Sequence, residues 1–589
     1  MDNHRQFVRL SAYNSATYPT HQSSCQGTES QSSDEPFHHT PAPPYAALDP
    51  RRYRGHRRRT ALPAAAARRQ RNRPTDPHRA AQRAGRERLH RRFPADAAGT
   101  AHRRTRREPR TIDNIYVRDD PYATNTRSLY VYFTTEQPTT VSYTVAAEGY
   151  PDFSADAYEG VDGATTEHEF LVLGLLPDVT NTITLTITDE TGGTTERVIE
   201  REGLGLLGTE EVRLEQPVQP DEGADLSNGL YAILGNDSDD QDFMFYYDAN
   251  GVLRGEVPIL FYRSHRLLFD DDGLMWFSAS TEKMAAMDRL GRLVKILDLG
   301  DRYILHHDYA FDADQNLVLL ATELNRSDGC VQDQIVKLDT DTGKVTPLLD
   351  MGDMFPEYKM STDHAGIDES DLSATGKWDW IHFNTIQMLP DGSALLSARE
   401  TSTIIKIDDL EGTPTLDYMI GEPSVWAGTP QEDDFLTKVG DFPDTGGQHS
   451  ITYVDDPALS DGQYYLYMFD NNYGSAQTRP DFDWTVIDGI VTKYSIATEG
   501  AYSQYRRYLV DESAGTYTEV NAFDVPYSPL VSSAQELDGG RVLIDSGLQG
   551  LFGVYDESTG ELLAQYRMKL NTSYIYRVYE YDFKGFYFA

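Results

Sequence analysis

The chain has 589 residues and a net charge of −40, with 93 acidic residues against 53 Lys and Arg. This length allows two or more domains with a large buried core. No apolar run reaches the ~18 residues of a membrane-spanning helix, so no membrane span is predicted.

Residues 1–110 form an arginine-rich arm that is predicted to be disordered. They contain 23 Arg and no Lys against 9 acidic residues, so the arm carries +14 while residues 111–589 carry −54. Its Arg, Ala, Pro and His have almost no apolar periodicity. It lacks aromatic–basic interleaving and any nucleic-acid motif, so no nucleic-acid partner is expected. An all-arginine bias is typical of a GC-rich stretch read in a wrong frame, and we expect much of the arm to be a mis-called start or a frameshift product.

The two cysteines, Cys25 and Cys330, allow at most one disulfide, and we expect two unpaired thiols. The opening residues Met1–Arg5 are not those of a signal peptide. If the true start was lost, an export signal could be lost with it, so the cellular location stays open.

Residues 111–202 are predicted to form a small β-sandwich of immunoglobulin or fibronectin character. Period-two alternation and β-branched or aromatic residues predict its strands, with turns at Pro177-Asp178 and Thr191-Gly192-Gly193. The expected strands are 128–136, 139–148, 167–176 and 181–189. The Gly-, Glu- and Pro-rich residues 203–228 are predicted to be a linker.

From about residue 229 onward a loose repeat begins, with strands joined by Asp- and Gly-containing turns. Four-stranded units at a spacing of ~40–60 residues fit the blades of a β-propeller. The sequence therefore predicts an all-β chain in which residues 229–589 form a six-bladed β-propeller, closed by strands near Tyr574–Ala589. Propellers place functional groups on their innermost strands and at the mouth of the central channel.

Three short polar islands each lie at the start of one of these repeats. They are His306-His307-Asp308, Asp379-Trp380-Ile381-His382-Phe383-Asn384 and Gly446-Gly447-Gln448-His449-Ser450. Arg399 follows the second island in Ser397-Ala398-Arg399, and Phe469-Asp470-Asn471 follows the third. Three repeats that each begin with a buried-type histidine predict a shared anion-binding centre.

The spacing within the islands predicts which side chains share a face. His382 and Asn384 are two residues apart on a strand, so both point the same way. His306 and Asp308 share that relation, while His307 faces the other way if the strand is regular.

Each island also has a structural alternative. A single histidine such as His449 is more often a hydrogen-bonded core residue than a catalyst, and Arg399 could equally form a structural salt bridge.

Arginine and asparagine beside histidines suit a tetrahedral oxyanion such as sulfate or phosphate, which a guanidinium can grip with two hydrogen bonds. A nucleophilic histidine attacking sulfur or phosphorus needs such neighbours to spread the negative charge. The chain has no Cys cluster and no HExxH, which disfavours zinc, although channel histidines could still bind Cu or Zn. P-loop, GxGxxG, GxSxG and 3′-phosphoadenosine-binding signatures are absent, so no cofactor is expected.

The order of these motifs, behind a β-sandwich, resembles that of bacterial arylsulfate sulfotransferases over about residues 112–589. The resemblance implies transfer of a sulfuryl group from a phenolic sulfate ester to an acceptor phenol. It implies a ping-pong route through a covalent sulfohistidine, without a nucleotide cofactor. It also implies a periplasmic or exported location and a homodimer.

Carried over by motif, His449 matches the nucleophile, and His382, Asn384 and Arg399 match residues that hold the sulfuryl group. The first island supplies one more site histidine. The register against the following turn favours His307, and the internal repeat favours His306; both are retained, with a preference for His307.

Two departures from the family pattern stand out. Ser450 replaces the acid that usually follows the Gln-His pair, which puts the orientation of His449 in question. No cysteine lies near residues 420–450, where some exported members have a disulfide.

Two other classes of function remain as alternatives. One is a non-enzymatic propeller that binds or scaffolds a partner. The other is a metal-dependent hydrolase or lyase that uses the channel histidines.

Overall fold

The computed structural model describes residues 110–589 except 222–223, 225, 228, 236–241, 261, 364–376 and 571–573. These residues are almost entirely β-strand and loop, with two short α-helices, α3 (Met351–Met354) and α4 (Pro356–Ser361). The predicted all-β class is confirmed. Residues 1–109 of the arginine-rich arm, with Cys25, lie outside the described residues. Cys330 is a free, buried thiol, and no described helix is long and apolar enough to cross a membrane.

The N-terminal domain is built around one long strand. β2 (Ser128–Ala146) pairs through its first half with β4 and through its second half with β3 and β5. Two strands were expected here, but the chain continues through Gln137 and Pro138 with only a register shift between Thr134 and Thr139. The other strands are β1 (Tyr116–Asp119), β3 (Phe153–Asp156), β4 (Thr165–Leu173), β5 (Thr180–Asp189) and β6 (Thr194–Glu202).

The alternation that predicted these strands also forms the core of this domain. Buried residues alternate with less buried ones over Val131–Phe133 and Thr139–Ala146 of β2, and the buried Leu129, Val131 and Phe133 pack in one core with Phe170 of β4 and Leu185 of β5. A strand with one buried face alternates apolar and polar residues, because successive side chains point to opposite faces of the sheet.

The remaining described strands form six sheets of four or five strands each. The first contains β32 (Val578–Tyr581), β8 (Leu230–Ile233), β9 (Phe243–Tyr247) and β10 (Leu253–Pro258); the second β11 (Leu268–Phe269), β12 (Met275–Ser280), β13 (Lys283–Met287) and β14 (Leu293–Asp298); the third β15 (Tyr303–Phe311), β16 (Leu317–Glu323), β17 (Gln334–Leu338) and β18 (Val345–Asp350).

The fourth sheet contains β19 (Phe383–Met388), β20 (Ala394–Ala398), β21 (Thr403–Asp408) and β22 (Thr415–Ile420); the fifth β24 (His449–Val454), β25 (Gln463–Asp470), β26 (Tyr502–Asp511), β27 (Thr516–Pro526) and β23 (Thr437–Lys438); the sixth β28 (Ser533–Leu537), β29 (Arg541–Ser546), β30 (Leu551–Asp556), β31 (Leu562–Arg567) and β7 (Glu215–Val218). Four short 3₁₀ turns lie in the loops, at Pro423–Trp426, Pro430–Asp433, Trp484–Val486 and Gly547–Gln549.

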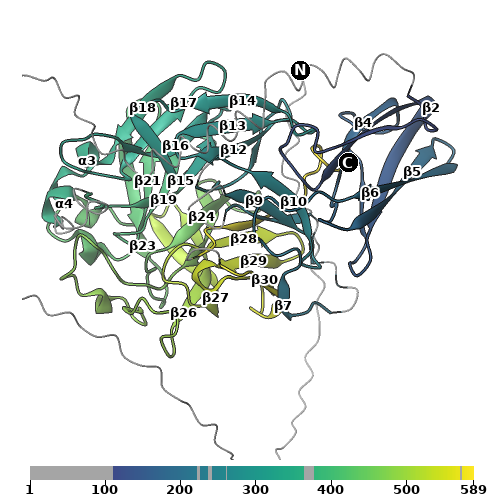
Figure 1. Cartoon of the computed structure of the whole chain (residues 1–589). Coiled ribbons are helices and arrows are strands. Elements are labelled where there is room, and N and C mark those ends of the chain that lie inside the picture. The colour runs from purple at the N-terminus through teal and green to yellow at the C-terminus, as the bar shows by residue number, and fades with distance from the viewer. Residues whose placement is uncertain are drawn as a thin grey trace, which may run out of the picture. The chain divides into compact units, whose positions relative to one another are not determined.

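The strands of these sheets pair antiparallel except for β23 with β27, and the sheets are arranged as the blades of a propeller (Figure 1). The first strand of each neighbouring sheet contacts the next, as β15 with β19, β19 with β24 and β24 with β28, so these strands form the inner edge. The sixth sheet packs against the first through buried side chains such as Leu543, Phe552 and Tyr231.

Both ends of this domain take part in its closure. β32, from the segment expected to close the ring, pairs with β8 and supplies the inner strand of the first sheet. β7 lies in the segment predicted to be a linker, yet it pairs with β31 as the outer strand of the sixth sheet. The segment 203–228 therefore contains a strand of the propeller.

Candidate active site

The histidines of the three islands lie at the inner edge of three neighbouring sheets. His306 and His307 are on β15, His382 directly precedes β19, and His449 is the first residue of β24. β19 contacts both β15 and β24. The fold thus brings four imidazoles from three sheets into one region.

A residue with a left-handed backbone conformation lies within or directly before each of these strands at the site. The φ angle is +56° at His307, +52° at His382 and +57° at Ser450, and the pairing register shifts beside each of them. Such bulges re-aim side chains. The rings of His306 and His307 therefore both belong to one cluster, and the strict alternation of a regular strand does not apply here.

His307 is the central ring of this cluster. Its centroid lies 4.6 Å from that of His382, 5.1 Å from that of His306 and 5.6 Å from that of Tyr576. The Nδ1 atoms of His306 and His307 are 2.9 Å apart. One neutral ring must donate and the other accept, so the pair holds a single proton between these two atoms.

His449 is held through one side of its ring. Its Nδ1 lies 2.7 Å from Asn471 Oδ1 and 2.9 Å from the Gly447 carbonyl oxygen. The amide nitrogen of Asn471 donates to the carbonyls of Ser528 and Val531, which fixes the amide with its oxygen toward the ring. Because both partners of Nδ1 are acceptors, Nδ1 carries the proton and Nε2 has the lone pair.

Burial lowers the pKa of all four imidazoles. The pKa of His306 falls to about 3, and those of His307, His382 and His449 fall well below the ordinary value. The positive charge of Arg399 lowers the pKa of His382 and His449 further. All four rings are therefore neutral near pH 7, the form that can attack an electrophile or accept a proton.

Asp379 connects His382 with Arg399. Its Oδ2 lies 2.5 Å from His382 Nδ1 and 3.8 Å from Arg399 Nη2. Burial raises the pKa of Asp379 to about 6, although the charge of Arg399 opposes this. Above that pH the carboxylate accepts a hydrogen bond from the Nδ1–H group of His382, so the lone pair of this ring is on Nε2. Arg399 is anchored by Glu400, whose Oε1 accepts from Nε at 3.2 Å and also from Nη2.

The side chain of Asn384 is fully buried. Both ends of its amide make hydrogen bonds within the protein. Nδ2 donates to the Gln448 carbonyl at 2.7 Å, and Oδ1 accepts from Thr385 Oγ1 at 3.1 Å. Gln448 directly precedes His449, so this bond ties the two neighbouring inner strands together.

A buried ion pair supports the cluster. Asp308 accepts from Arg577 Nη1 at 2.9 Å and from Arg266 Nε at 2.7 Å. Arg577 Nη2 also donates to the Asn384 carbonyl at 2.8 Å. These contacts join β15, β19 and the residue before β32, and they add positive charge near His449.

Several polar atoms in the cluster are buried without a hydrogen-bond partner among the described residues: His306 Nε2, His382 Nε2 and Asp379 Oδ1. Buried polar atoms are normally satisfied, so this group marks a place where a polar ligand fits.

The donor atoms of Asp379, His382 and Glu400 lie within 4.8 Å of one another and could hold a metal ion. Arg399 already bonds Glu400, however, and its guanidinium would repel a divalent cation at that place. The same guanidinium would attract the oxygens of a sulfuryl group.

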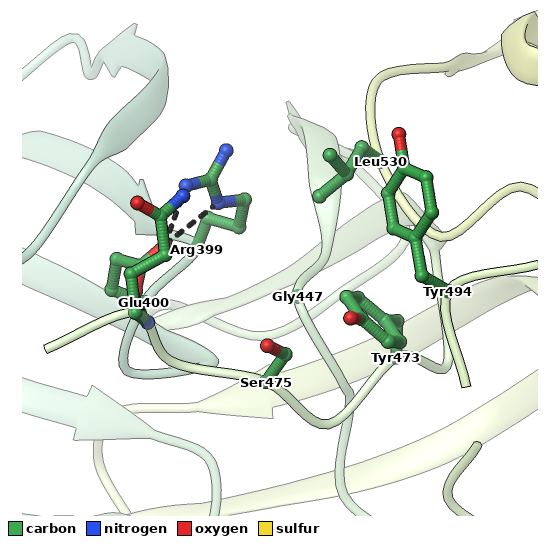
Figure 2. Close-up of a pocket in the computed structure, with 8 residues that line it drawn as sticks. Arg399, Glu400, Gly447, Tyr473, Ser475, Tyr494 and Leu530 are labelled. Atoms are coloured by element: carbon green, nitrogen blue, oxygen red, sulfur yellow. Dashed lines mark hydrogen bonds and ion pairs between the residues drawn. The ribbon is translucent and has the colours of Figure 1, made fainter. Parts of the chain in front are cut away.

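A cavity of about 150 Å³ lies beside Arg399 (Figure 2). Gly447, whose carbonyl contacts His449, is part of its lining, so the cavity adjoins the loop that holds His449. The other lining residues are Arg399, Glu400, Tyr473, Ser475, Gln477, Tyr494 and Leu530.

Three residues of the site were given no role from the sequence. Asp379 stands three residues before His382, and Asn471 stands in the polar run that follows the third island, so both had a positional signal. Arg577 had none, because its segment was expected only to close the ring.

The chain matches two models of known protein families. A family model described as "Arylsulfotransferase (ASST)" matches residues 215–577, and one described as "Arylsulfotransferase Ig-like domain" matches residues 116–202. No curated protein matches the chain.

Similar solved structures include a protein from Lactobacillus plantarum, with 11% identity over 75% of this chain and 98% of that chain at a TM-score of 0.31. A streptogramin B lyase has 12% identity over 60% of this chain and 87% of its own at a TM-score of 0.29. The Dos1 propeller has 13% identity over 74% of each chain at a TM-score of 0.23.

Proposed function

The chain belongs to the arylsulfotransferase family, and on that premise we propose that it moves a sulfuryl group from a phenolic sulfate ester to an acceptor phenol by way of a sulfohistidine on His449. The observation that carries the proposal is the fixed tautomer of His449. With Nδ1 bonded to Asn471 and Gly447, the lone pair of Nε2 is available for attack on sulfur.

In the first step the Nε2 lone pair of His449 forms a bond to the ester sulfur. The bond from sulfur to the phenolic oxygen breaks, and the oxygen leaves with the electron pair. Arg399 binds the sulfuryl oxygens, where negative charge is concentrated. When the Nδ1–H of His306 donates a hydrogen bond to His307 Nδ1, His307 carries its own proton on Nε2 and can donate a hydrogen bond to the leaving oxygen, which departs as the phenolate anion.

In the second step the acceptor phenol gives its proton to a neutral histidine as its oxygen attacks sulfur. The bond between sulfur and Nε2 breaks, and the lone pair returns to His449. The imidazolium then releases this proton to solvent, which balances the phenolate anion that left in the first step, so the exchange needs no cofactor or oxidant.

We assign the base of the second step to His382. Its Nε2 is buried without a partner among the described residues. The carboxylate of Asp379 on Nδ1 stabilises the imidazolium that forms when His382 takes a proton. The family resemblance implied that His382 and Asn384 hold the sulfuryl group. The contacts of Asn384 support instead a positioning role, because its amide holds the chain next to His449.

Assays with 4-nitrophenyl sulfate test the proposal. With phenol present, the protein should release nitrophenolate continuously; without phenol, release should stop after about one equivalent and leave an acid-labile sulfuryl adduct on the His449 peptide. His449→Leu, checked for folding by its melting temperature, should lose both. Sulfuryl transfer by this variant would reject the assignment.

The same assays separate the alternatives. Continuous release without an acceptor indicates a hydrolase, and loss of activity with a chelator indicates a metal-dependent enzyme. A folded protein that never releases nitrophenolate would be a binding propeller.

A further inference from the structure

One guanidinium connects the inner edges of four neighbouring sheets. Arg577 directly precedes β32, the inner strand of the first sheet, and its side chain is fully buried. Its Nη1 donates to Asp308 on β15 at 2.9 Å and to the His265 carbonyl, three residues before β11, at 3.4 Å. Its Nη2 donates to the carbonyl of Asn384 on β19 at 2.8 Å. A single side chain thus joins the first sheet to the next three.

Two of these bonds end beside histidines of the site. Asp308 directly follows His307, and Asn384 stands two residues after His382. The backbone is left-handed at both histidines, with φ angles of +56° and +52°. Such a conformation in a residue other than glycine persists only where the surrounding structure holds it. The bonds of Arg577 hold the chain just after each of these positions.

A third connection reaches the nucleophile through one threonine. Thr385 Oγ1 lies 3.4 Å from Arg577 Nη2 and accepts from the backbone N–H of Ser450 at 3.0 Å. Ser450 directly follows His449 and has a left-handed backbone as well, with a φ angle of +57°. The same guanidinium is therefore one side chain away from the strand that begins with His449.

The distribution of these bonds distinguishes Arg577 from a simple counter-ion. Asp308 already has a second partner, Arg266, which donates to it from Nε at 2.7 Å and from Nη2 at 2.6 Å. Neutralising Asp308 does not by itself require Arg577. A planar fork of N–H donors can reach several acceptors in different directions, whereas the ammonium of a lysine is a single point of charge.

We propose that Arg577 is a positioning residue of the catalytic centre, which fixes the inner strands of the third, fourth and fifth sheets relative to one another and so sets the spacing of their imidazoles. Those imidazoles belong to His307, His382 and His449. This inference rests on the proposed function. Since Arg577 directly precedes the strand that closes the ring, the centre is assembled only when the end of the chain is in place.

Arg577→Lys tests the role, because it keeps the positive charge and loses the fork. With 4-nitrophenyl sulfate and phenol, kcat should fall by about 100-fold, the scale on which a misplacement of ~1 Å acts. KM should stay nearly constant, since the groups that bind the ester are still present. Loss of stability alone would lower the amount of folded enzyme, which the melting temperature and the burst amplitude measure separately.

Arg254 provides a matched control. It is also fully buried, and it donates to Asp248 at 2.7 Å and to two main-chain carbonyls, none of which belongs to the site. Arg254→Lys should lower the melting temperature as Arg577→Lys does but leave kcat unchanged. An equal fall of kcat in both variants, or an unchanged kcat in Arg577→Lys, would overturn the inference.

Thr385→Val cuts the third connection without altering the guanidinium. It should lower kcat with KM nearly constant, and Thr385→Ser, which keeps the hydroxyl, should restore kcat. Combined with Arg577→Lys, the loss should be about 10-fold smaller than the product of the two single losses, as for residues in one hydrogen-bond network. Losses that simply multiply would contradict a shared path. If Arg577→Lys does not fold, an unchanged kcat in Thr385→Val rejects the inference.

Crystal structures of the two lysine variants test the inference without turnover. The rings of His307, His382 and His449 should shift relative to one another by about 1 Å in Arg577→Lys and keep their places in Arg254→Lys. Rings that do not move in Arg577→Lys reject the positioning role whatever the activity. If the unmodified protein transfers no sulfuryl group, the proposed function fails instead, and the ring positions still decide the role of Arg577.

Discussion

Asn471 Oδ1 lies 2.7 Å from His449 Nδ1, across the hairpin that joins β24 to β25. An amide thus orients this imidazole where many catalytic histidines have a carboxylate. Ser450, which replaces the family's acid, donates instead to the Ala534 carbonyl and contacts Tyr579. Burial lowers the pKa of the ring, the hydrogen bond to Asn471 raises it, and the charge of Arg399 lowers it again, so that His449 stays unprotonated.

Replacing this amide by a carboxylate should move the pH dependence. The lowered pKa of His449 means that the neutral nucleophile persists as the pH falls below the ordinary histidine value. In Asn471→Asp the new negative charge should raise that pKa by about 1–3 units, the effect of an opposite charge at this range. The acid limb of kcat/KM should therefore move to higher pH by the same amount. kcat/KM reports the free enzyme, and a profile identical to that of the unmodified protein would contradict the tautomer assigned to His449.

Asp379→Asn should impair the second half of the reaction more than the first. The variant keeps a hydrogen-bond acceptor for His382 Nδ1 but removes the charge that stabilises the imidazolium. The burst with 4-nitrophenyl sulfate should remain, while transfer to weakly acidic phenols should fall by about 100-fold, within the usual range for general base catalysis. The defect should shrink as the acceptor phenol becomes more acidic, because such phenols need less help to lose a proton.

The pH profile of the Asp379→Asn variant gives a second check. Since the pKa of Asp379 is raised to about 6, the second half-reaction of the unmodified protein should gain activity as the pH rises through that value. This limb should be absent from the variant. An equal defect with every acceptor would assign Asp379 a purely structural role.

His307 and His306 should differ in importance. The ring of His307 lies against His382 and Tyr576, whereas His306 bonds to His307 from the other side. His307→Phe should lower kcat by about 100-fold or more, the usual loss for a hydrogen-bond donor to an oxygen on which negative charge develops. His306→Phe removes only the partner of His307 Nδ1, and its loss should be about 10-fold smaller. Steady-state kinetics on variants with unchanged melting temperatures make this comparison; a larger loss in His306→Phe would reverse the two roles.

The order of elements and the identity of the histidine cluster were predictable from local patterns. Alternation in β2, β4 and β5 marked the sandwich, and the Asp–Gly turns marked the propeller strands. A histidine at the start of several repeats pointed to the inner edge, because each repeat begins with its inner strand. The continuous strand through Pro138 was not predictable, because Pro138 lies between Thr134 and Thr139, where the pairing of β2 is interrupted and a proline removes no ladder hydrogen bond.

The contacts within the site depended on features that no local pattern carries. The bulges at His307, His382 and Ser450 are left-handed positions occupied by residues other than glycine, so nothing in the sequence marks them. They orient the rings of both His306 and His307 into one cluster. The bond from Asn384 to Gln448 and the ion pair of Arg577 with Asp308 join residues far apart in the chain. Such pairings follow from closure of the ring, and a single sequence does not reveal them.

Asp545 on β29 is a buried acid whose effect should appear in the stability of the fold. Its side chain is fully buried, and neither carboxylate oxygen has a hydrogen-bond partner among the described residues. Burial raises the pKa of this carboxyl well above its ordinary value. In the unfolded chain the group ionises near pH 4, so the folded state holds an extra proton above that pH.

The sign of the effect follows from this proton. The folded state loses stability as the pH rises above about 4, by about 1.4 kcal/mol per pH unit, until the raised pKa of the folded state is reached. Asp545→Asn removes the titration. The melting temperature of the variant should be close to that of the unmodified protein at pH 4. It should exceed that of the unmodified protein by a growing margin as the pH rises to 7. Asp470→Asn is a matched control, because that equally buried carboxylate pairs with Arg506 at 2.8 Å, and its loss should lower the melting temperature at pH 7. A difference between Asp545→Asn and the unmodified protein that stays constant from pH 4 to pH 7 would show that Asp545 does not carry a raised pKa.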